Sequence, residues 1–138
     1  MLTTIEKVLF LKGVSIFKEI PGEVLSQIAQ IAEEVQIEKG SRIFEEGEPG
    51  DSLYLIVRGG VRVHKGTREV AVLREGECFG EMAILDNEPR SASITALEDV
   101  QLLRIWSDDF YEMLADRVEI ARGIFKVLSR RLRQAIGR

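Results

Sequence analysis

The sequence has very few of the residues that build covalent or metal-centred sites. Its 138 residues include one cysteine, Cys78, and one histidine, His64. A single cysteine cannot form a disulfide within the chain, and one histidine with one cysteine cannot supply the usual ligand sets of zinc. Catalysis by a Cys/His or Ser/His pair would depend on His64 alone. We therefore expect no metal centre, no cofactor and no enzymatic activity.

Long apolar runs are also absent. The longest unbroken run, residues 53–57, has five residues, whereas a membrane-spanning helix needs about 20. The first twelve residues are interrupted by Glu6 and Lys7 and have no small-residue cleavage pattern, so we expect no signal peptide. These absences predict a cytoplasmic protein without membrane insertion. The length corresponds to a single domain with one core and one principal site.

The net charge of −4 conceals an uneven distribution of charge along the chain. Residues 117–138 carry +6 and residues 1–116 carry −10. An acidic body with a basic C-terminal segment is not typical of a general nucleic-acid binder. The basic segment is interpreted either as a solvated helix face or as a helix that faces a partner or ligand.

The middle of the chain has the pattern of a β protein. Eight of the 12 glycines lie between positions 40 and 80, and short apolar runs separate or follow them. Turn signals at such intervals between β-branched runs indicate an all-β sandwich or barrel. Gly66-Thr67 lies between two of these runs, where a tight hairpin turn would fit. The predicted strands are 42–45, 53–58, 61–65, 69–73, 93–97 and 100–105.

Both ends of the chain are predicted to be helical. Residues 4–10 form a short amphipathic segment, and apolar residues from Val24 to Val35 recur at three- and four-residue steps after Pro21. A third helix is predicted after Ser107, which could cap it, with a break near Asp116. The last helix then begins at about Arg117, and its apolar stripe is Val118, Ala121, Ile124, Phe125, Leu128, Leu132 and Ile136. This stripe extends to the chain end, where a barrel mouth or a second subunit would have to cover it.

The segment 78–93 departs from the strand pattern. Gly80 precedes five good helix formers, and a short helix that opens at a glycine offers free backbone N–H groups to an anion. Arg90 and Ser91 follow on the next predicted strand, where a guanidinium and a hydroxyl could meet the same phosphate. Glu81 would repel a phosphate unless it faced a hydroxyl donor. The residues suggest a nucleotide-like ligand with one phosphate and a free sugar hydroxyl, although a structural ion pair of Arg90 with Glu81 is the plainer interpretation.

The sequence of the whole segment favours the nucleotide site over the structural ion pair. Phe-Gly-Glu-Met-Ala-Ile-Leu at 79–85, followed by Pro-Arg-Ser-Ala at 89–92, resembles the phosphate-binding cassette of the cyclic nucleotide-binding domain family. That family includes catabolite activator proteins and the regulatory subunits of protein kinase A. Gly-Glu-Pro-Gly-Asp at 47–51 and the run up to Gly59 resemble the glycine-punctuated hairpin that precedes the cassette in the family. The resemblance covers nearly the whole chain.

The resemblance implies a fold and a domain organisation. The fold is an eight-stranded jelly-roll β-barrel with N-terminal helices and a long C-terminal helix pair. The domain would cover 1–138, with N-terminal helices in 1–35, the barrel in 36–106, the cassette in 79–92 and the C-terminal helices in 107–138.

The resemblance also assigns ligand-binding roles. Glu81 would accept the ribose 2′-OH, Gly80 and Ala83 would shape the amide site, and Arg90 with Ser91 and Ala92 would bind the phosphate. Met82 holds the position that senses the ligand and relays to the helices. Val63, Val70 and Ala71 would line the purine side, and each is equally well interpreted as a plain core residue. Arg131 lies where it could reach Glu81.

The expected function is that of a sensor module that couples cyclic nucleotide binding to movement of the C-terminal helix. The ligand is expected to be cAMP, with cGMP left open because Ser91 could reach a guanine amino group. The alternative is an interaction domain of the same fold that does not respond to nucleotide. Besides the nucleotide, the partners considered are a second copy bound through the C-terminal helix and an effector domain or protein. No direct nucleic-acid contact is expected, because the chain stops at Arg138 before any segment that could enter a major groove.

Overall fold

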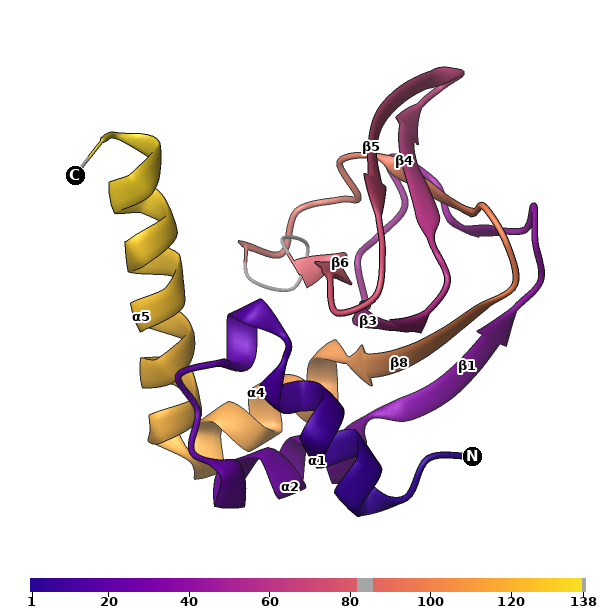
Figure 1. Cartoon of the computed structure of the whole chain (residues 1–138). Helices are drawn as coiled ribbons and strands as arrows, with labels where there is room; N and C mark the ends of the chain where they lie inside the picture. Colours follow the sequence, from indigo (N-terminus) through magenta and orange to yellow (C-terminus); the bar gives the residue numbers. More distant parts are fainter. Residues whose placement is uncertain (82–85, 138) are drawn as a thin grey trace.

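The structure, a computed structural model, describes residues 1–81 and 86–137 and is mainly β with flanking helices (Figure 1). The helices are α1 (Thr4–Lys12), α2 (Gly22–Ile31), α4 (Ser107–Asp116) and α5 (Val118–Ala135), with a 3-10 turn, η1 (Ser15–Phe17). The strands are β1 (Glu33–Ile37), β2 (Arg42–Phe44), β3 (Ser52–Arg58), β4 (Val61–Lys65), β5 (Arg68–Leu73), β6 (Cys78–Phe79), β7 (Ser93–Ala96) and β8 (Val100–Trp106). The six predicted strands and the Gly66-Thr67 hairpin turn are confirmed.

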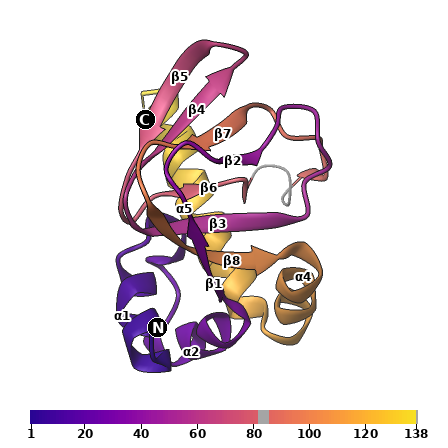
Figure 2. The ribbon, with the colours of Figure 1, turned by 90° about the vertical axis from the view of Figure 1, so that its right-hand side faces the viewer.

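The eight strands form two antiparallel sheets of four strands each. One sheet has the order β1-β8-β3-β6 and the other the order β2-β7-β4-β5. Within the described residues no strand ladder joins the two sheets, so the closed jelly-roll barrel of the sequence-based prediction is not observed. The long strands β3 and β8 lie side by side at the centre of the first sheet, and Figure 2 shows the second sheet above it.

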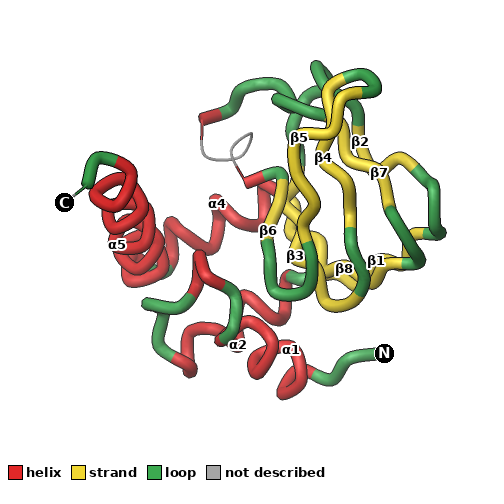
Figure 3. The backbone as a smooth tube through the Cα atoms, turned by 45° about the horizontal axis from the view of Figure 1, so that its top comes forward, coloured by secondary structure: helices red, strands yellow, loops and turns green. Residues whose placement is uncertain are grey.

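Alternate residues of β3 and β8 belong to two different parts of the hydrophobic core. Leu53 and Leu55 on β3 pack with the helices, whereas the intervening Tyr54 and Ile56 pack between the two sheets. Successive strand residues point to opposite faces, so a strand with both faces covered becomes a continuous apolar run. The result is a layer of helices below one sheet and a second sheet above it (Figure 3).

Helix α5 stands beside the rest of the molecule and contacts it along one face (Figure 1). Ile120, Ile124 and Val127 are buried, and α5 packs against η1. Gly123 permits this close approach, because a Cβ at that position would lie 2.9 Å from Ile20 Cγ1. Among the described residues no helix has the length and apolarity needed to cross a bilayer.

Two local predictions were wrong. The helix predicted to reach Val35 ends at Ile31, and Val35 lies in β1, where it pairs with Leu102 of β8. Strand pairing with β8 therefore overrides the helical spacing of the apolar residues. Ser107 was expected to cap a helix, but it is the first residue of α4, and Trp106 holds the N-cap position without a side-chain hydrogen bond.

Candidate functional site

Arg90 is a buried charged residue in the segment that precedes β7. The residue is 4% exposed, and its guanidinium donates from Nη1 to the carbonyl of Gly80 at 3.1 Å and from Nη2 to the carbonyl of Ser52 at 2.9 Å. Asp51 Oδ1 lies 3.7 Å from Nη2. Within the described residues no acceptor lies within hydrogen-bonding distance of Nε, although this atom is buried. The Nε atoms of Arg104 and Arg117 are also buried without a hydrogen-bond partner in the described part of the chain, but of the three arginines only Arg90 lines the pocket described below.

The loop between β2 and β3 holds the backbone of Arg90. The Gly47 N–H donates to the Arg90 carbonyl at 2.9 Å, and the Arg90 N–H donates to the Glu48 carbonyl at 2.8 Å. Asp51 and Ser52 at the end of the same loop face the guanidinium. The two segments that the sequence singled out, 47–59 and 79–92, therefore meet at Arg90.

The protein environment of Arg90 does not neutralise it completely. Burial lowers the pKa of its guanidinium below the ordinary value, while Tyr54, Asp51 and Glu48 act in the opposite direction. The ordinary pKa of arginine is so high that the side chain stays cationic. Asp51 is largely exposed and lies beyond hydrogen-bonding distance. A buried cation with so weak a counter-charge is favourable for an anionic ligand.

A pocket of about 390 Å³ opens beside Arg90. Within the described residues Arg90 is the only cationic side chain that lines it, and the acidic side chains at its wall belong to Glu81, Asp86 and Glu88. The volume lies in the range of pockets that bind small molecules. The remaining lining residues are Phe44, Val63, Leu73, Cys78, Phe79, Gly80, Pro89, Ser91, Ala92 and Ile94.

Most of the predicted site residues that the structure describes are brought together in this pocket. Gly80, Glu81, Arg90, Ser91, Ala92 and Val63 all line it. Met82 and Ala83 lie outside the described residues. Val70 and Ala71 do not contribute to the pocket and are exposed. The reason is that β5 is the edge strand of its sheet, and Leu73, which lies on the same strand face as Ala71, is the β5 residue that reaches the pocket.

Glu81 and Cys78 line both this pocket and a second one. The Cys78 thiol donates to Glu81 Oε2 at 3.9 Å. Burial raises the pKa of this thiol well above its ordinary value, and the negative charge of Glu81 raises it further. The thiol is therefore a neutral donor, and Glu81 remains free to accept other hydrogen bonds on its open side.

The second pocket, of about 320 Å³, lies between the sheets and α5. Arg131 and Glu81 are both at its wall, but Arg131 donates from Nη2 to Ser15 Oγ of η1 at 2.8 Å. Arg131 and Glu81 thus line the same pocket, and the predicted reach of Arg131 to Glu81 stays a prediction. The hydrogen bond that Arg131 makes is to Ser15.

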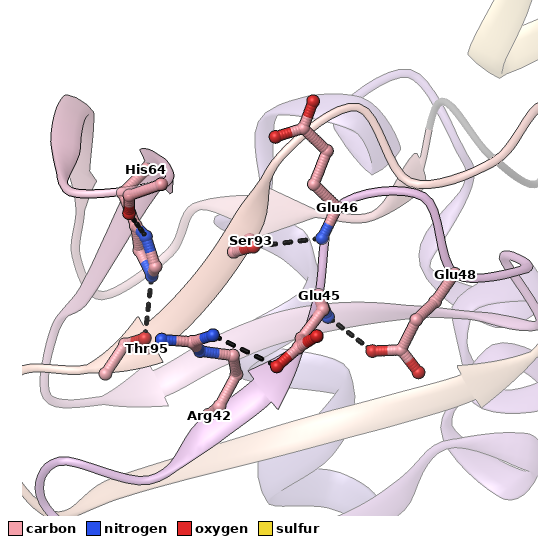
Figure 4. A network of polar contacts seen from close by, with 8 residues as sticks. Arg42, Glu45, Glu46, Glu48, His64, Ser93 and Thr95 are labelled. Carbon is pink, nitrogen blue, oxygen red and sulfur yellow. Dashed lines mark hydrogen bonds and ion pairs between the residues drawn. The ribbon is translucent and has the colours of Figure 1, made fainter.

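A network of polar contacts supports the site from the outer side of the β2-β7-β4-β5 sheet (Figure 4). Ser93 Oγ accepts from the Glu46 N–H at 2.9 Å and so attaches the β2–β3 loop to β7. His64 is buried between the Gly66 carbonyl at 2.7 Å and Thr95 Oγ1 at 2.8 Å. The described residues contain no cluster that could hold a metal ion, and His64 lies in a structural network.

Three strand residues of the pocket wall were not identified from the sequence. Phe44, Leu73 and Ile94 lie on three different strands, and each was treated only as a strand residue. The register of the β2-β7-β4-β5 sheet places Phe44 opposite Ile94, and Ile94 opposite Val63. Because Val63 was already a candidate, the pairing of strands is the signal that could have identified Ile94 and Phe44.

Comparisons with known proteins agree with this geometry. The model of the family described as "Cyclic nucleotide-binding domain" matches residues 34–117. The chain is 31% identical over 124 residues to a CRP-like cAMP-activated global transcriptional regulator of Mycobacterium tuberculosis, covering 86% of this chain and 55% of the relative. It is 36% identical over 115 residues to a cAMP-dependent protein kinase regulatory subunit of Aspergillus fumigatus, covering 82% of this chain and 28% of the relative.

A solved structure shows the same fold over nearly its whole length. The N-terminal domain of a transcriptional regulator from Streptomyces coelicolor A3(2) superposes with a TM-score of 0.82 at 31% identity, covering 91% of this chain and 94% of the other. The chain spans about half, or less, of the two curated relatives named above. The family model covers both the loop that holds Arg90 and the segment that carries it, and the chain belongs to the cyclic nucleotide-binding domain family.

Proposed function

We propose that the chain is a regulatory module that binds cAMP in the pocket beside Arg90 and transmits binding to α5. The observation that carries this proposal is the buried guanidinium of Arg90 at the wall of a pocket of about 390 Å³, with Asp51 Oδ1 3.7 Å away as its counter-charge. An arginine fork is suited to two oxygens of one phosphate, and charge assistance strengthens such hydrogen bonds. The proposal treats residues 1–138 as one module without catalytic activity.

The pocket residues divide between the phosphate and the sugar. Arg90 binds the cyclic phosphate, with Ser91 and the backbone near Gly80 and Ala92 as further donors. Glu81 lies on the same pocket wall and accepts the ribose 2′-OH, which removes the repulsion that a carboxylate would otherwise exert on a phosphate. Met82 and Ala83 belong to the proposed site by their positions in the family motif. Val63, with the neighbouring Leu73 and Ile94, provides an apolar wall for the base.

The choice of cAMP is supported by the names of the matched relatives. The M. tuberculosis and A. fumigatus proteins are described as cAMP-activated and cAMP-dependent. Ser91 lines the pocket with an exposed hydroxyl, so cGMP is the competing ligand to be measured. The prediction of no direct nucleic-acid contact stays a prediction for this chain, although the M. tuberculosis relative is named a transcriptional regulator.

Coupling to α5 is proposed through the second pocket. Glu81 lies at the wall of both pockets, and Arg131 of α5 faces the second one. A ligand shifts a conformational equilibrium only by its differential affinity for the two states. A ligand that rearranges Glu81 changes what Arg131 can bind, and α5 then moves relative to η1.

An interaction role for α5 is a second candidate, favoured by its exposed apolar side chains. Val118, Phe125 and Leu132 recur every seven residues and are 63%, 66% and 65% exposed. A seven-residue apolar repeat on a helix surface is typical of a face that packs against another helix. A second copy of the chain or an effector would cover this face, whether or not nucleotide binds.

The testing experiment is calorimetric titration of the purified chain with cAMP and cGMP, with sulfate as the anion control. We expect one cAMP per chain, weaker cGMP binding and no comparable heat from sulfate. Binding of neither nucleotide would overturn the proposal. Sedimentation of the same samples with and without cAMP distinguishes a sensor from a constitutive dimer, because only a sensor changes its hydrodynamic behaviour on ligand addition.

A further inference from the structure

The guanidinium of Arg90 lies on the face of an aromatic ring. Its Cζ is 4.0 Å from the centroid of Phe44, the last residue of β2. Phe44 is half-buried and lines the same pocket as Arg90. A cation over an aromatic face is attracted by the ring quadrupole, and the attraction is stronger where water is excluded.

Three contacts determine the plane of the Arg90 guanidinium. The carbonyls of Gly80 and Ser52 accept from the two Nη atoms, and the guanidinium carbon lies over the Phe44 ring. Asp51 supplies charge from 3.7 Å but no hydrogen bond. The two carbonyls fix two points in the guanidinium plane, so a rotation about the line joining them is opposed by the ring.

The Phe44 ring is itself held by two other aromatic residues. Its centroid lies 6.1 Å from that of Tyr54 and 5.9 Å from that of Phe79, and those two rings stack at 5.0 Å with an interplanar angle of 11°. Tyr54 and Phe79 are both buried. Aromatic groups at such separations attract one another and restrict ring motion. The orientation of the ring is therefore set by the core between the two sheets.

We propose that Phe44 is a positioning residue for the phosphate site, acting through Arg90. It holds the guanidinium in a fixed orientation at the pocket wall before the ligand arrives. A group already fixed in its binding geometry loses less conformational freedom on binding. This inference rests on the proposed function, because the ligand whose affinity it changes is the cyclic nucleotide.

The test compares Phe44→Leu and Phe44→Tyr with the unmodified chain in calorimetric titrations with cAMP. Leucine fills most of the space without a π face, and we expect cAMP affinity to fall about 3- to 30-fold. Tyrosine keeps the face, so we expect Phe44→Tyr to retain affinity within about 2-fold. Phe10→Leu is the matched control, because Phe10 is also half-buried but packs in the helix-side core away from the pocket.

A second readout does not require ligand. Because Arg90 Cζ lies 4.0 Å from the Phe44 centroid, the neighbouring Nε–H proton should show an NMR shift from the ring current, which Phe44→Leu abolishes and Phe44→Tyr preserves. A leucine variant that binds cAMP as tightly as the unmodified chain overturns the inference, as do equal losses in Phe44→Leu and Phe10→Leu. If the unmodified chain binds no cyclic nucleotide, the proposed function fails instead, whatever the NMR shift shows.

Discussion

Arg131 and Ser15 connect α5 to η1 through a hydrogen bond of 2.8 Å from Nη2 to Oγ. Glu81 lies at the wall of the same pocket as both residues. The proposed coupling requires Arg131 to leave Ser15 for Glu81 when the ligand binds. The hydroxyl of Ser15 therefore competes with ligand-induced movement of the helix.

Replacing Ser15 by alanine should tighten cAMP binding. The substitution removes a contact that opposes the proposed movement, and one exposed hydrogen bond corresponds to an affinity gain of about 2- to 5-fold. Calorimetry on Ser15→Ala measures the gain, and Ser26→Ala, which removes a hydroxyl bonded to the Glu23 carbonyl, is the control. Unchanged or weaker cAMP binding in Ser15→Ala would exclude this competition.

Arg90→Lys tests the phosphate role of the guanidinium. Lysine keeps the positive charge but loses the planar fork, so we expect cAMP affinity to fall at least about 100-fold, as for two charge-assisted hydrogen bonds lost. Thermal unfolding should show that the domain still folds. Arg62→Lys, on β4 away from the pocket wall, should bind normally. Equal affinity of Arg90→Lys and the unmodified chain would refute the assignment.

Glu81→Gln tests recognition of the sugar hydroxyl. An amide accepts a hydrogen bond from the 2′-OH less strongly than a carboxylate does, so cAMP affinity should fall about 10-fold. The same variant should bind 2′-deoxy-cAMP as the unmodified chain does, because that ligand has no hydroxyl to donate. Similar losses for both ligands in parallel titrations would show that Glu81 acts elsewhere. Glu69→Gln on the exposed part of β5 is the charge control.

Gly80→Ala should lower cAMP affinity as well as strain the backbone. Gly80 has φ +82°, and a Cβ there would lie 2.7 Å from Arg90 Nη1 and 3.1 Å from the Ser52 carbonyl. Gly40 has φ +84° with no atom within 4 Å of an added Cβ, so Gly40→Ala reports the strain alone. We expect Gly40→Ala to lose about 1–2 kcal/mol of unfolding free energy and Gly80→Ala to lose at least as much, because its Cβ also meets neighbouring atoms. Only Gly80→Ala should lose cAMP affinity, and normal binding by it would contradict the geometry.

The lowered pKa of Glu33 predicts that the free energy of unfolding depends on pH. Hydrogen bonds from Trp106 and Arg104 lower the pKa of its carboxyl group below the ordinary value. A group with a lowered pKa in the folded state stabilises it above the unfolded-state pKa and loses this effect as pH falls through the folded value. Glu33→Gln should therefore be less stable near neutral pH by about 0.2–1 kcal/mol, the range of exposed pairs. Urea unfolding should show the difference vanishing in acid, and a constant difference across pH would contradict it.

Local sequence pattern predicted the strands well because each has a run of β-branched or apolar residues between turn signals. It missed β6, whose two residues, Cys78 and Phe79, are too short a run to form a pattern. It also extended α2 to Val35, because apolar spacing alone does not distinguish the end of a helix from the start of a buried strand. Both errors concern strands whose existence depends on a partner distant in the chain.

The sequence by itself determined the fold class and the family, because the cassette and its upstream hairpin are contiguous strings, and it predicted most of the described candidate residues that line the pocket beside Arg90. Only the tertiary structure decided what surrounds Arg90. Phe44, Asp51 and the Ser52 carbonyl contact its guanidinium from 38 to 46 positions away. It also decided that Arg131 bonds Ser15, since the packing of α5 against η1 sets which acceptor a long side chain reaches. Such contacts depend on strand register and helix packing, which no local pattern of residues encodes.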